Sequence, residues 1–238
     1  MNIQIFSDAD EVAAEAAKLI AMIARQSVEE RGRFILAVSG GRTPWQMLRV
    51  LGKEDVPWKS VHVFQVDERI APSGHPDRNL TQLRHCLLEN SPISEHHIYA
   101  MPVEWNDLEF AADEYADLLS QQAGSPPIID LIHLGLGADG HTASLIPENR
   151  VLEIVDRDVA ITGIYQGRER MTLTYPIINR ARNIMWVITG AEKAPMLKRL
   201  LDADTSIPAG RIHQEKAFIL ADQDAAGDIS EIGSSRKT

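Results

Sequence analysis

The sequence predicts a single α/β domain with a Rossmann-like, mostly parallel sheet that is covered by helices on both faces. Short apolar runs rich in β-branched residues alternate along the 238 residues with longer amphipathic segments, and strands that alternate with helices favour a parallel sheet. The runs FILAVS and IIDLIHLGL are almost entirely apolar, as expected of strands buried on both faces. No internal repeat and no proline-rich linker divides the chain.

The expected elements follow from this alternation. Strands are expected at residues 3–6, 34–39, 61–66, 128–134, 159–165, 185–189 and 217–220. Helices are expected at residues 8–30, 43–51, 79–89, 108–122 and 191–202. The apolar periodicity is lost from Ala221 onward, and we expect one domain over residues 1–222 and a flexible C-terminal tail over residues 223–238.

The composition of the chain argues against several classes of protein. The chain carries 24 Lys and Arg against 34 Asp and Glu, a net charge of −10, which argues against a general nucleic-acid binder. No apolar stretch is long enough for a membrane span, and the N-terminus lacks the pattern of a secretory signal. The single cysteine, Cys86, suits a reducing compartment. We therefore expect a soluble, cytoplasmic protein that is a monomer or a small homo-oligomer and contacts neither nucleic acid nor membrane.

In such a sheet, ligands bind beyond the carboxyl ends of the strands. The first loop there reads Ser39-Gly40-Gly41-Arg42-Thr43. The two glycines allow a tight turn, and the amides and dipole at the start of the following helix form a seat for a phosphate. A strand-to-helix turn in which Thr43 caps the helix explains the same residues without a ligand.

A serine nucleophile is a competing interpretation of this loop. Residues 37–41 differ from the G-x-S-x-G elbow only in having Ala37 in place of the first glycine. Asp139 and His141 follow in the usual order. However, they stand only two residues apart, so we expect the acid to be poorly placed to orient the imidazole, which argues against this interpretation.

The second loop carries Asp67, Glu68 and Arg69 directly after an apolar strand. Two carboxylates and a guanidinium at a strand end need solvent or partners. A surface salt-bridge cluster accounts for them, but their position at the edge where ligands bind favours a functional role.

The third loop, residues 135–145, is the most distinctive. Gly135, Gly137 and Gly140 spell G-x-G-x-x-G, but Pro147 leaves no room for the long helix that a dinucleotide site requires. We therefore expect no nicotinamide cofactor. The eight histidines lack metal-ligand spacing, so no metal is expected either. His141, among glycines at a strand end, is the candidate general base.

Two further cations stand at strand ends. Lys193 falls in the first turn of an expected helix, where the dipole disfavours a cation unless an anion binds beside it, although a solvated surface lysine is equally compatible. Arg170 lies just before the run MTLTYP and is a second candidate for holding a phosphate. His133, inside a buried strand, is expected to be a core residue.

Taken together, the motifs SGGRTP, VDER, GLGADGHTASLIP, RMTLTYPIIN and TGAEKAPML resemble the 6-phosphogluconolactonases. These enzymes share the glucosamine-6-phosphate deaminase-like fold with the aminosugar-phosphate isomerases. The resemblance runs from about residue 3 to residue 222. Arg69, and Ala143-Ser144-Leu145 where the deaminases continue A-F-N-E, favour the lactonase. Arg78 and Leu80 depart from the lactonase pattern, which usually has serine before the asparagine and often an aromatic residue after it.

The resemblance implies hydrolysis of 6-phospho-D-glucono-1,5-lactone in the oxidative pentose phosphate pathway, without a cofactor. It implies His141 as the general base, Asp139 as the residue that positions the loop or the imidazole, and Arg69 or loop amides at the oxyanion. The remaining candidates would bind the substrate and its phosphate: Ser39, Gly40, Gly41, Arg42, Thr43, Asp67, Glu68, Arg170 and Lys193.

Two other functions stay open at this point. An aminosugar-phosphate deaminase or isomerase would use Asp67 to abstract a carbon-bound proton, with His141 assisting ring opening. A sugar-phosphate sensor without catalysis is the second. Such sensors usually carry a helix-turn-helix, and this sequence starts directly with the first expected strand.

Overall fold

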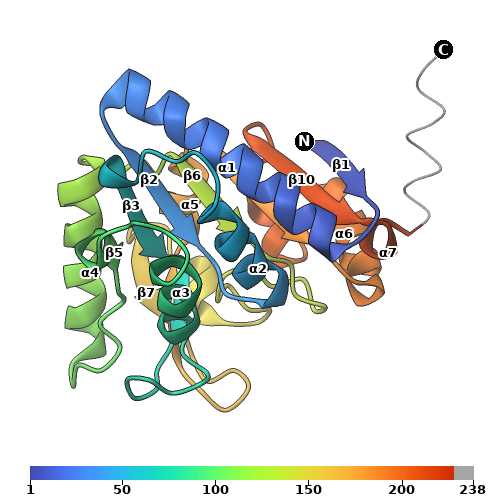
Figure 1. Cartoon of the computed structure of the whole chain (residues 1–238). Helices are drawn as coiled ribbons and strands as arrows, with labels where there is room; N and C mark the ends of the chain where they lie inside the picture. Colours follow the sequence, from blue (N-terminus) through green and yellow to red (C-terminus); the bar gives the residue numbers. More distant parts are fainter. Residues whose placement is uncertain (228–238) are drawn as a thin grey trace.

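The computed structural model describes residues 1–227, and a seven-stranded parallel sheet runs through its centre (Figure 1). In spatial order the strands are β1 (Asn2–Phe6), β10 (Ala217–Asp222), β9 (Ile184–Ile188), β6 (Leu131–Leu134), β2 (Phe34–Val38), β3 (Val61–Gln65) and β5 (Ile98–Tyr99). Every neighbouring pair is parallel. The predicted α/β fold class is confirmed.

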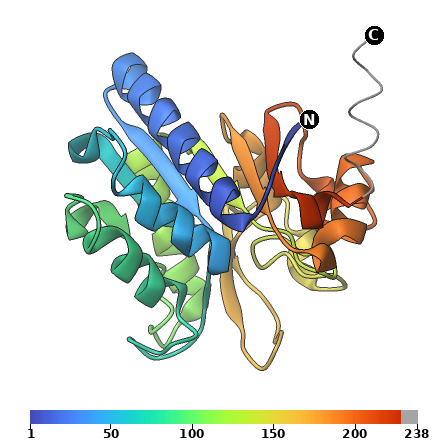
Figure 2. The same cartoon turned by 45° about the vertical axis from the view of Figure 1, so that its right-hand side comes forward.

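Helices cover both faces of this sheet, as the turned view also shows (Figure 2). One face packs against α1 (Ala9–Arg31), α2 (Arg42–Leu51) and α3 (Asn79–Leu88). The other packs against α4 (Leu108–Ala123), α5 (Tyr175–Arg180) and α6 (Ala194–Leu201). In the described part of the chain, short 3₁₀ turns complete the connections: η1 (Trp58–Ser60), η2 (Glu95–His97), η3 (Arg150–Glu153), η4 (Ala191–Lys193) and η5 (Pro208–Arg211).

A second sheet was not predicted. It contains β4 (Asp67–Arg69), β8 (Arg170–Leu173) and β7 (Val159–Ile161), all paired antiparallel. The expectation that residues 159–165 form a strand of the main sheet is wrong: only the first three are a strand, and they belong to a hairpin with β8. A β-rich run does not specify its partner, because strand propensity reflects packing in either kind of sheet.

The predicted end of the domain also needs a correction. Residues 223–226, assigned to the tail, form the short helix α7 (Gln223–Ala226), in which Ala225 and Ala226 are buried. The Asp222 carboxylate accepts the Ala225 amide at 2.8 Å and caps this turn. The rest of the predicted tail, residues 228–238, lies outside the described residues. Within residues 1–227, no helix has the length and apolar character to cross a membrane.

Candidate active site

One cavity of about 460 Å³ opens where the loops after β2, β6 and β9 meet strand β4. It gathers residues from all four strand-end loops that the sequence singled out. The predicted site residues in its wall are Ser39, Gly40, Gly41, Arg42, Thr43, Asp67, Arg69, His141, Arg170 and Lys193. Asp139 contacts the cavity through His141. Glu68 is absent from the wall.

His141 and Asp139 form a hydrogen-bonded pair. The imidazole Nδ1 lies 2.5 Å from Asp139 Oδ1, and the His141 amide donates to the same oxygen at 3.2 Å. The expectation that two residues of separation place the acid poorly is wrong. The loop turns back on itself, because the Gly137 amide donates to the His141 carbonyl at 2.8 Å, and this brings the carboxylate beside the ring.

Glycines make this loop possible at two positions. A Cβ on Gly137 would lie 2.1 Å from His141 Nδ1, so the imidazole rests directly against the glycine backbone. Gly140 has φ 84°, a left-handed value that favours glycine. A Cβ there would also lie 2.7 Å from Cβ of Ile207.

The second oxygen of the Asp139 carboxylate binds Tyr165, a residue for which no role was predicted from the sequence. The hydroxyl of Tyr165 donates to Asp139 Oδ2 at 2.9 Å. Burial alone raises the pKa of the Asp139 carboxyl, but the charge of His141 and the hydrogen bonds from His141 and Tyr165 outweigh it, so this pKa lies below its ordinary value. The carboxylate is therefore ionised at neutral pH and holds the imidazole by Nδ1, while Nε2 has no hydrogen-bond partner within residues 1–227.

The glycine loop after β2 leads into a helix start that no side chain caps. Gly41, with φ 141°, is the N-cap of α2. Thr43 does not cap the helix as expected, because its hydroxyl lies 2.7 Å from that of Thr189. The first amides of α2 thus lack a side-chain acceptor at a dipole end that favours an anion.

Ser39 faces a different partner from the one that a nucleophile needs. Its hydroxyl donates to the His133 carbonyl at 3.1 Å, and its amide donates to His133 Nδ1 at 3.2 Å. His133 is fully buried, as predicted, and burial lowers its pKa to about 3, so the ring is neutral. A serine activated for attack needs a hydrogen bond to its base. Ser39 has none with His141.

Two arginines face the cavity from the small sheet. Arg69 and Arg170 are direct partners in the β4–β8 ladder. Arg69 Nη1 donates to Asn79 Oδ1 at 2.7 Å. Arg170 is 5% exposed, and burial lowers its pKa. Within residues 1–227, the Nε atoms of both arginines are buried without a hydrogen-bond partner. Like charges directly opposite in a sheet repel each other, so this part of the wall is suited to an anion.

Two more cations line the cavity wall. Arg42 and Lys193 have no salt bridge within residues 1–227. Lys193 ends η4, one residue before α6, rather than lying inside a continuous helix as expected. The turn before it is held by a residue that the sequence analysis missed: both carboxylate oxygens of Asp222 accept the Gly190 amide at 3.0 Å. Asp222 belongs to no recognisable sequence motif. Its contact with Gly190 becomes apparent only from the order of the strands, which places β10 beside β9.

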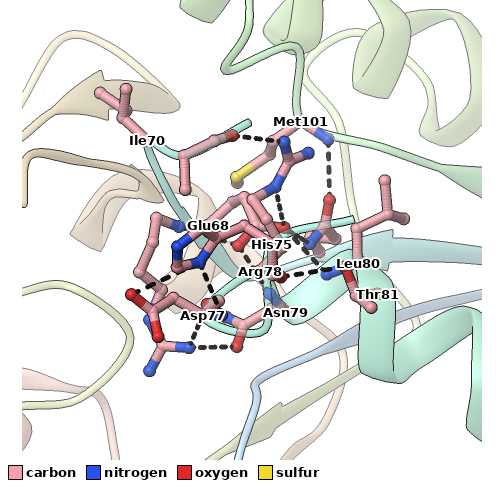
Figure 3. A network of polar contacts seen from close by, with 12 residues as sticks. Glu68, Ile70, His75, Asp77, Arg78, Asn79, Leu80, Thr81 and Met101 are labelled. Atoms are coloured by element: carbon pink, nitrogen blue, oxygen red, sulfur yellow. Dashed lines mark hydrogen bonds and ion pairs between the residues drawn. The ribbon is translucent and has the colours of Figure 1, made fainter. Parts of the chain in front are cut away.

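Glu68 lies in a buried network of polar contacts and not in the cavity wall (Figure 3). It is fully buried, and its oxygens accept the amides of Arg69, Asn79 and Leu80 at 2.7–2.9 Å. The guanidinium of Arg78, 3% exposed, lies 3.1 Å from the same carboxylate. A buried charge needs such partners. This network fixes the start of α3 and thereby Asn79, which holds Arg69.

Asp67 does reach the cavity wall. Its Oδ2 accepts the Ser144 hydroxyl at 2.6 Å, and Asn79 Nδ2 donates to its carbonyl at 2.9 Å. No group of three or more His, Cys, Asp or Glu side chains in the described part of the chain could hold a metal ion. The chemistry available in the cavity is thus that of an imidazole, carboxylates and cations.

The chain is similar to known proteins over most of its length. The family model described as glucosamine-6-phosphate isomerases/6-phosphogluconolactonase matches residues 7–220. A 6-phosphogluconolactonase from Synechocystis is 38% identical over 212 residues, which cover 86% of this chain and 88% of that protein.

Solved structures show the same fold. A 6-phosphogluconolactonase from Trypanosoma cruzi superposes with a TM-score of 0.85 at 24% identity, covering 96% of this chain and 97% of the other. A monomeric glucosamine-6-phosphate deaminase superposes with a TM-score of 0.83 at 18% identity, covering 95% and 99%. The fold is therefore common to proteins with both names, and only the site can separate the two activities.

Proposed function

This chain belongs to the family of glucosamine-6-phosphate isomerases and 6-phosphogluconolactonases, and on that premise we propose that it hydrolyses 6-phospho-D-glucono-1,5-lactone to 6-phospho-D-gluconate. The observation that carries the proposal is the Asp139–His141 pair, which presents an oriented imidazole to a cavity lined by four cations. Relatives that are 38% and 33% identical to this chain bear the name of this activity.

His141 acts as the general base. Its Nε2 removes a proton from water, and the water oxygen forms a bond to the lactone carbonyl carbon. The carbonyl oxygen becomes an oxyanion, which Arg69 or loop amides stabilise. When the bond from that carbon to the ring oxygen breaks, the protonated His141 returns its proton to the ring oxygen. Asp139, bonded to Nδ1, keeps the ring oriented throughout.

The phosphate binds to the cations and amides of the same cavity. Arg42, Arg170 and Lys193, with the Ser39–Thr43 backbone, provide charge-assisted donors for it. The net charge of −10 does not oppose this binding, because repulsion from distant charges is screened over about 8 Å at physiological salt. Contacts at about 3 Å are hardly screened.

The proposal is tested by coupling glucose-6-phosphate dehydrogenase to this protein and following the disappearance of the lactone above its spontaneous hydrolysis. We expect rapid turnover by the wild type. His141→Ala should lose about 10²–10⁴-fold in kcat, whereas His213→Ala, at an exposed position outside the cavity, should keep the wild-type rate. Near-normal hydrolysis by His141→Ala would remove the imidazole from the mechanism.

One observation favours a second candidate, an aminosugar-phosphate deaminase or isomerase. Asp67 lines the cavity with His141 and is the carboxylate that such a reaction would use to move a carbon-bound proton. However, both its side-chain and main-chain oxygens accept hydrogen bonds from the protein. Ammonia release from glucosamine 6-phosphate, without lactone hydrolysis, would favour this candidate.

We also propose a cytoplasmic location and a monomer or small homo-oligomer. The buried single cysteine supports a reducing compartment. Light scattering at several protein concentrations measures the oligomeric state.

A further inference from the structure

Tyr165 contacts the proposed acid–base pair and an anion-binding arginine at the same time. Its hydroxyl donates to Asp139 Oδ2 at 2.9 Å. Its ring lies edge-on to the His141 imidazole, with centroids 5.5 Å apart. The guanidinium carbon of Arg170 lies 5.0 Å from the centre of the same ring. One side chain thus connects both functions of the cavity.

The hairpin that carries Tyr165 is held in place. Gln166 and Gly167 have φ of 51° and 82°, the values of a two-residue hairpin turn, and Tyr165 exchanges main-chain hydrogen bonds with Arg168. Arg168 Nε in turn donates to Asp77 at 2.9 Å. Figure 2 shows this hairpin projecting below the small sheet. The turn therefore presents the phenol from a fixed backbone.

We propose that Tyr165 is a positioning residue, which fixes the Asp139 carboxylate for His141 and holds Arg170 for the substrate's anionic group. This inference rests on the proposed function. Tyr165 itself takes no part in bond making. With Oδ1 on His141 and Oδ2 on Tyr165, the carboxylate is held at both ends and cannot rotate away from the imidazole. The cation–π contact similarly restricts the Arg170 guanidinium.

The contact has a measurable effect on Asp139. Its carboxyl faces His141 and Tyr165, and the phenol bond is one of the influences that lower its pKa. Tyr165 faces Asp139 and Arg170, and burial together with Asp139 raises the pKa of the phenol. The phenol is thus protonated, and able to donate, across the physiological range.

Tyr165→Phe removes the hydroxyl and keeps the ring. We expect the carboxyl carbon of Asp139, observed by NMR in the free protein and assigned with Asp139→Asn, to titrate about 0.4–1 pH unit higher, the equivalent of one ordinary hydrogen bond. We expect kcat for the lactone to fall about 2–10-fold, with KM nearly unchanged. Tyr165→Leu also removes the ring beside Arg170, so KM should rise as well.

Two comparisons separate positioning from general damage. Tyr175→Phe is the matched control, because it removes a phenol bond of 3.0 Å to the Pro208 carbonyl outside the cavity wall; the titration of Asp139 and kcat should both stay unchanged. In an Asp139→Asn background, Tyr165→Phe should reduce kcat by less than about twofold, because its effect passes through the carboxylate.

An unchanged titration of Asp139 together with a wild-type kcat in Tyr165→Phe would overturn the inference. Full, additive loss in the Asp139→Asn background would overturn it too. A wild type that shows no lactone hydrolysis, while Tyr165→Phe still shifts the titration, would overturn the proposed function and leave the positioning of Asp139 by Tyr165 supported.

Discussion

Arg69 and Arg170 stand directly opposite each other on neighbouring antiparallel strands, and both line the cavity. Paired cations in this position destabilise a sheet when nothing lies between them. Proteins tolerate the arrangement where a bound anion compensates it. The small sheet, which the sequence did not predict, therefore places two donors on one side of the proposed ligand.

Inorganic phosphate should stabilise the protein through this cluster. At ten times its Kd, a ligand that binds only the folded state adds about 1.4 kcal/mol, a rise in Tm of roughly 3–6 °C for a chain of this size. Thermal unfolding with increasing phosphate measures the effect. Arg170→Gln should lose most of it, while Arg211→Gln, an exposed arginine outside the cavity wall, should respond like the wild type. Equal responses of the two variants would argue against an anion at Arg170.

Gly137→Ala should reduce activity without unfolding the chain. The new Cβ would lie 2.1 Å from His141 Nδ1, so the imidazole must move away from Asp139 and kcat should drop at least about tenfold. Gly135→Ala is the comparison on the same loop: Gly135 also lines the cavity, but its Cβ meets nothing within 4 Å and leaves His141 in place. Steady-state kinetics and circular dichroism of both variants check this. Equal kcat values for the two alanine variants would contradict the proposed orientation of the ring.

Removing one charge of the buried Glu68–Arg78 pair should destabilise the protein more than replacing both charged side chains. Glu68→Gln removes the nearer charged partner of a guanidinium that is 3% exposed and leaves only the half-exposed Glu104 carboxylate, 3.5 Å away, which should cost about 3 kcal/mol. The double variant Glu68→Gln/Arg78→Met should lose less unfolding free energy than the sum of the losses in the two single variants. Lys198→Ala, in the exposed Lys198–Asp202 pair, should cost under about 1 kcal/mol. Urea unfolding measures all of these, and additive losses would show that the two charges are not coupled.

His133 should make the protein less stable at mildly acidic pH. Its pKa is lowered to about 3 in the folded state, whereas an unfolded histidine titrates near 6.5. Below about pH 6.5 the unfolded chain therefore binds the proton that the folded chain does not, and stability falls by roughly 1.4 kcal/mol per pH unit toward pH 3. Urea unfolding at pH 7.5 and pH 5 measures this loss.

The variant that tests His133 is His133→Asn, which retains an acceptor for the Ser39 amide. The wild type should lose about 2 kcal/mol more than this variant between pH 7.5 and pH 5. Identical losses would show that His133 is not the group responsible. His213→Asn, at an exposed position, serves as the control and should behave like the wild type.

The main sheet was predictable from local pattern, because apolar runs such as 34–39 can be satisfied only between two layers of helices. The clustering of the loops at its carboxyl edge was also predictable, because the topology of a parallel sheet brings their residues together. His141 stood out as a candidate because it lies among glycines at a strand end, and the structure places it in the cavity wall.

What the sequence did not reveal depends on long-range pairing. The β4–β8 ladder joins residues about 100 positions apart, and nothing local to Asp67–Arg69 marks it as a strand. Tyr165 lies 26 residues from Asp139, so no spacing rule connects the two. Glu68 could not be distinguished from Asp67 by position. Its burial follows from the network with Arg78, which sequence distance also conceals.

The order of the strands has a consequence for synthesis on the ribosome. β1 is made long before β10, and within residues 1–227 it pairs only with β10, at the margin of the main sheet. Residues 2–6 therefore lack this strand partner until residues 217–222 have emerged. The same late segment brings Asp222 to Gly190. A nascent chain halted before residue 217 can assemble the middle of its sheet, yet its binding pocket stays open on one side until translation has passed that point.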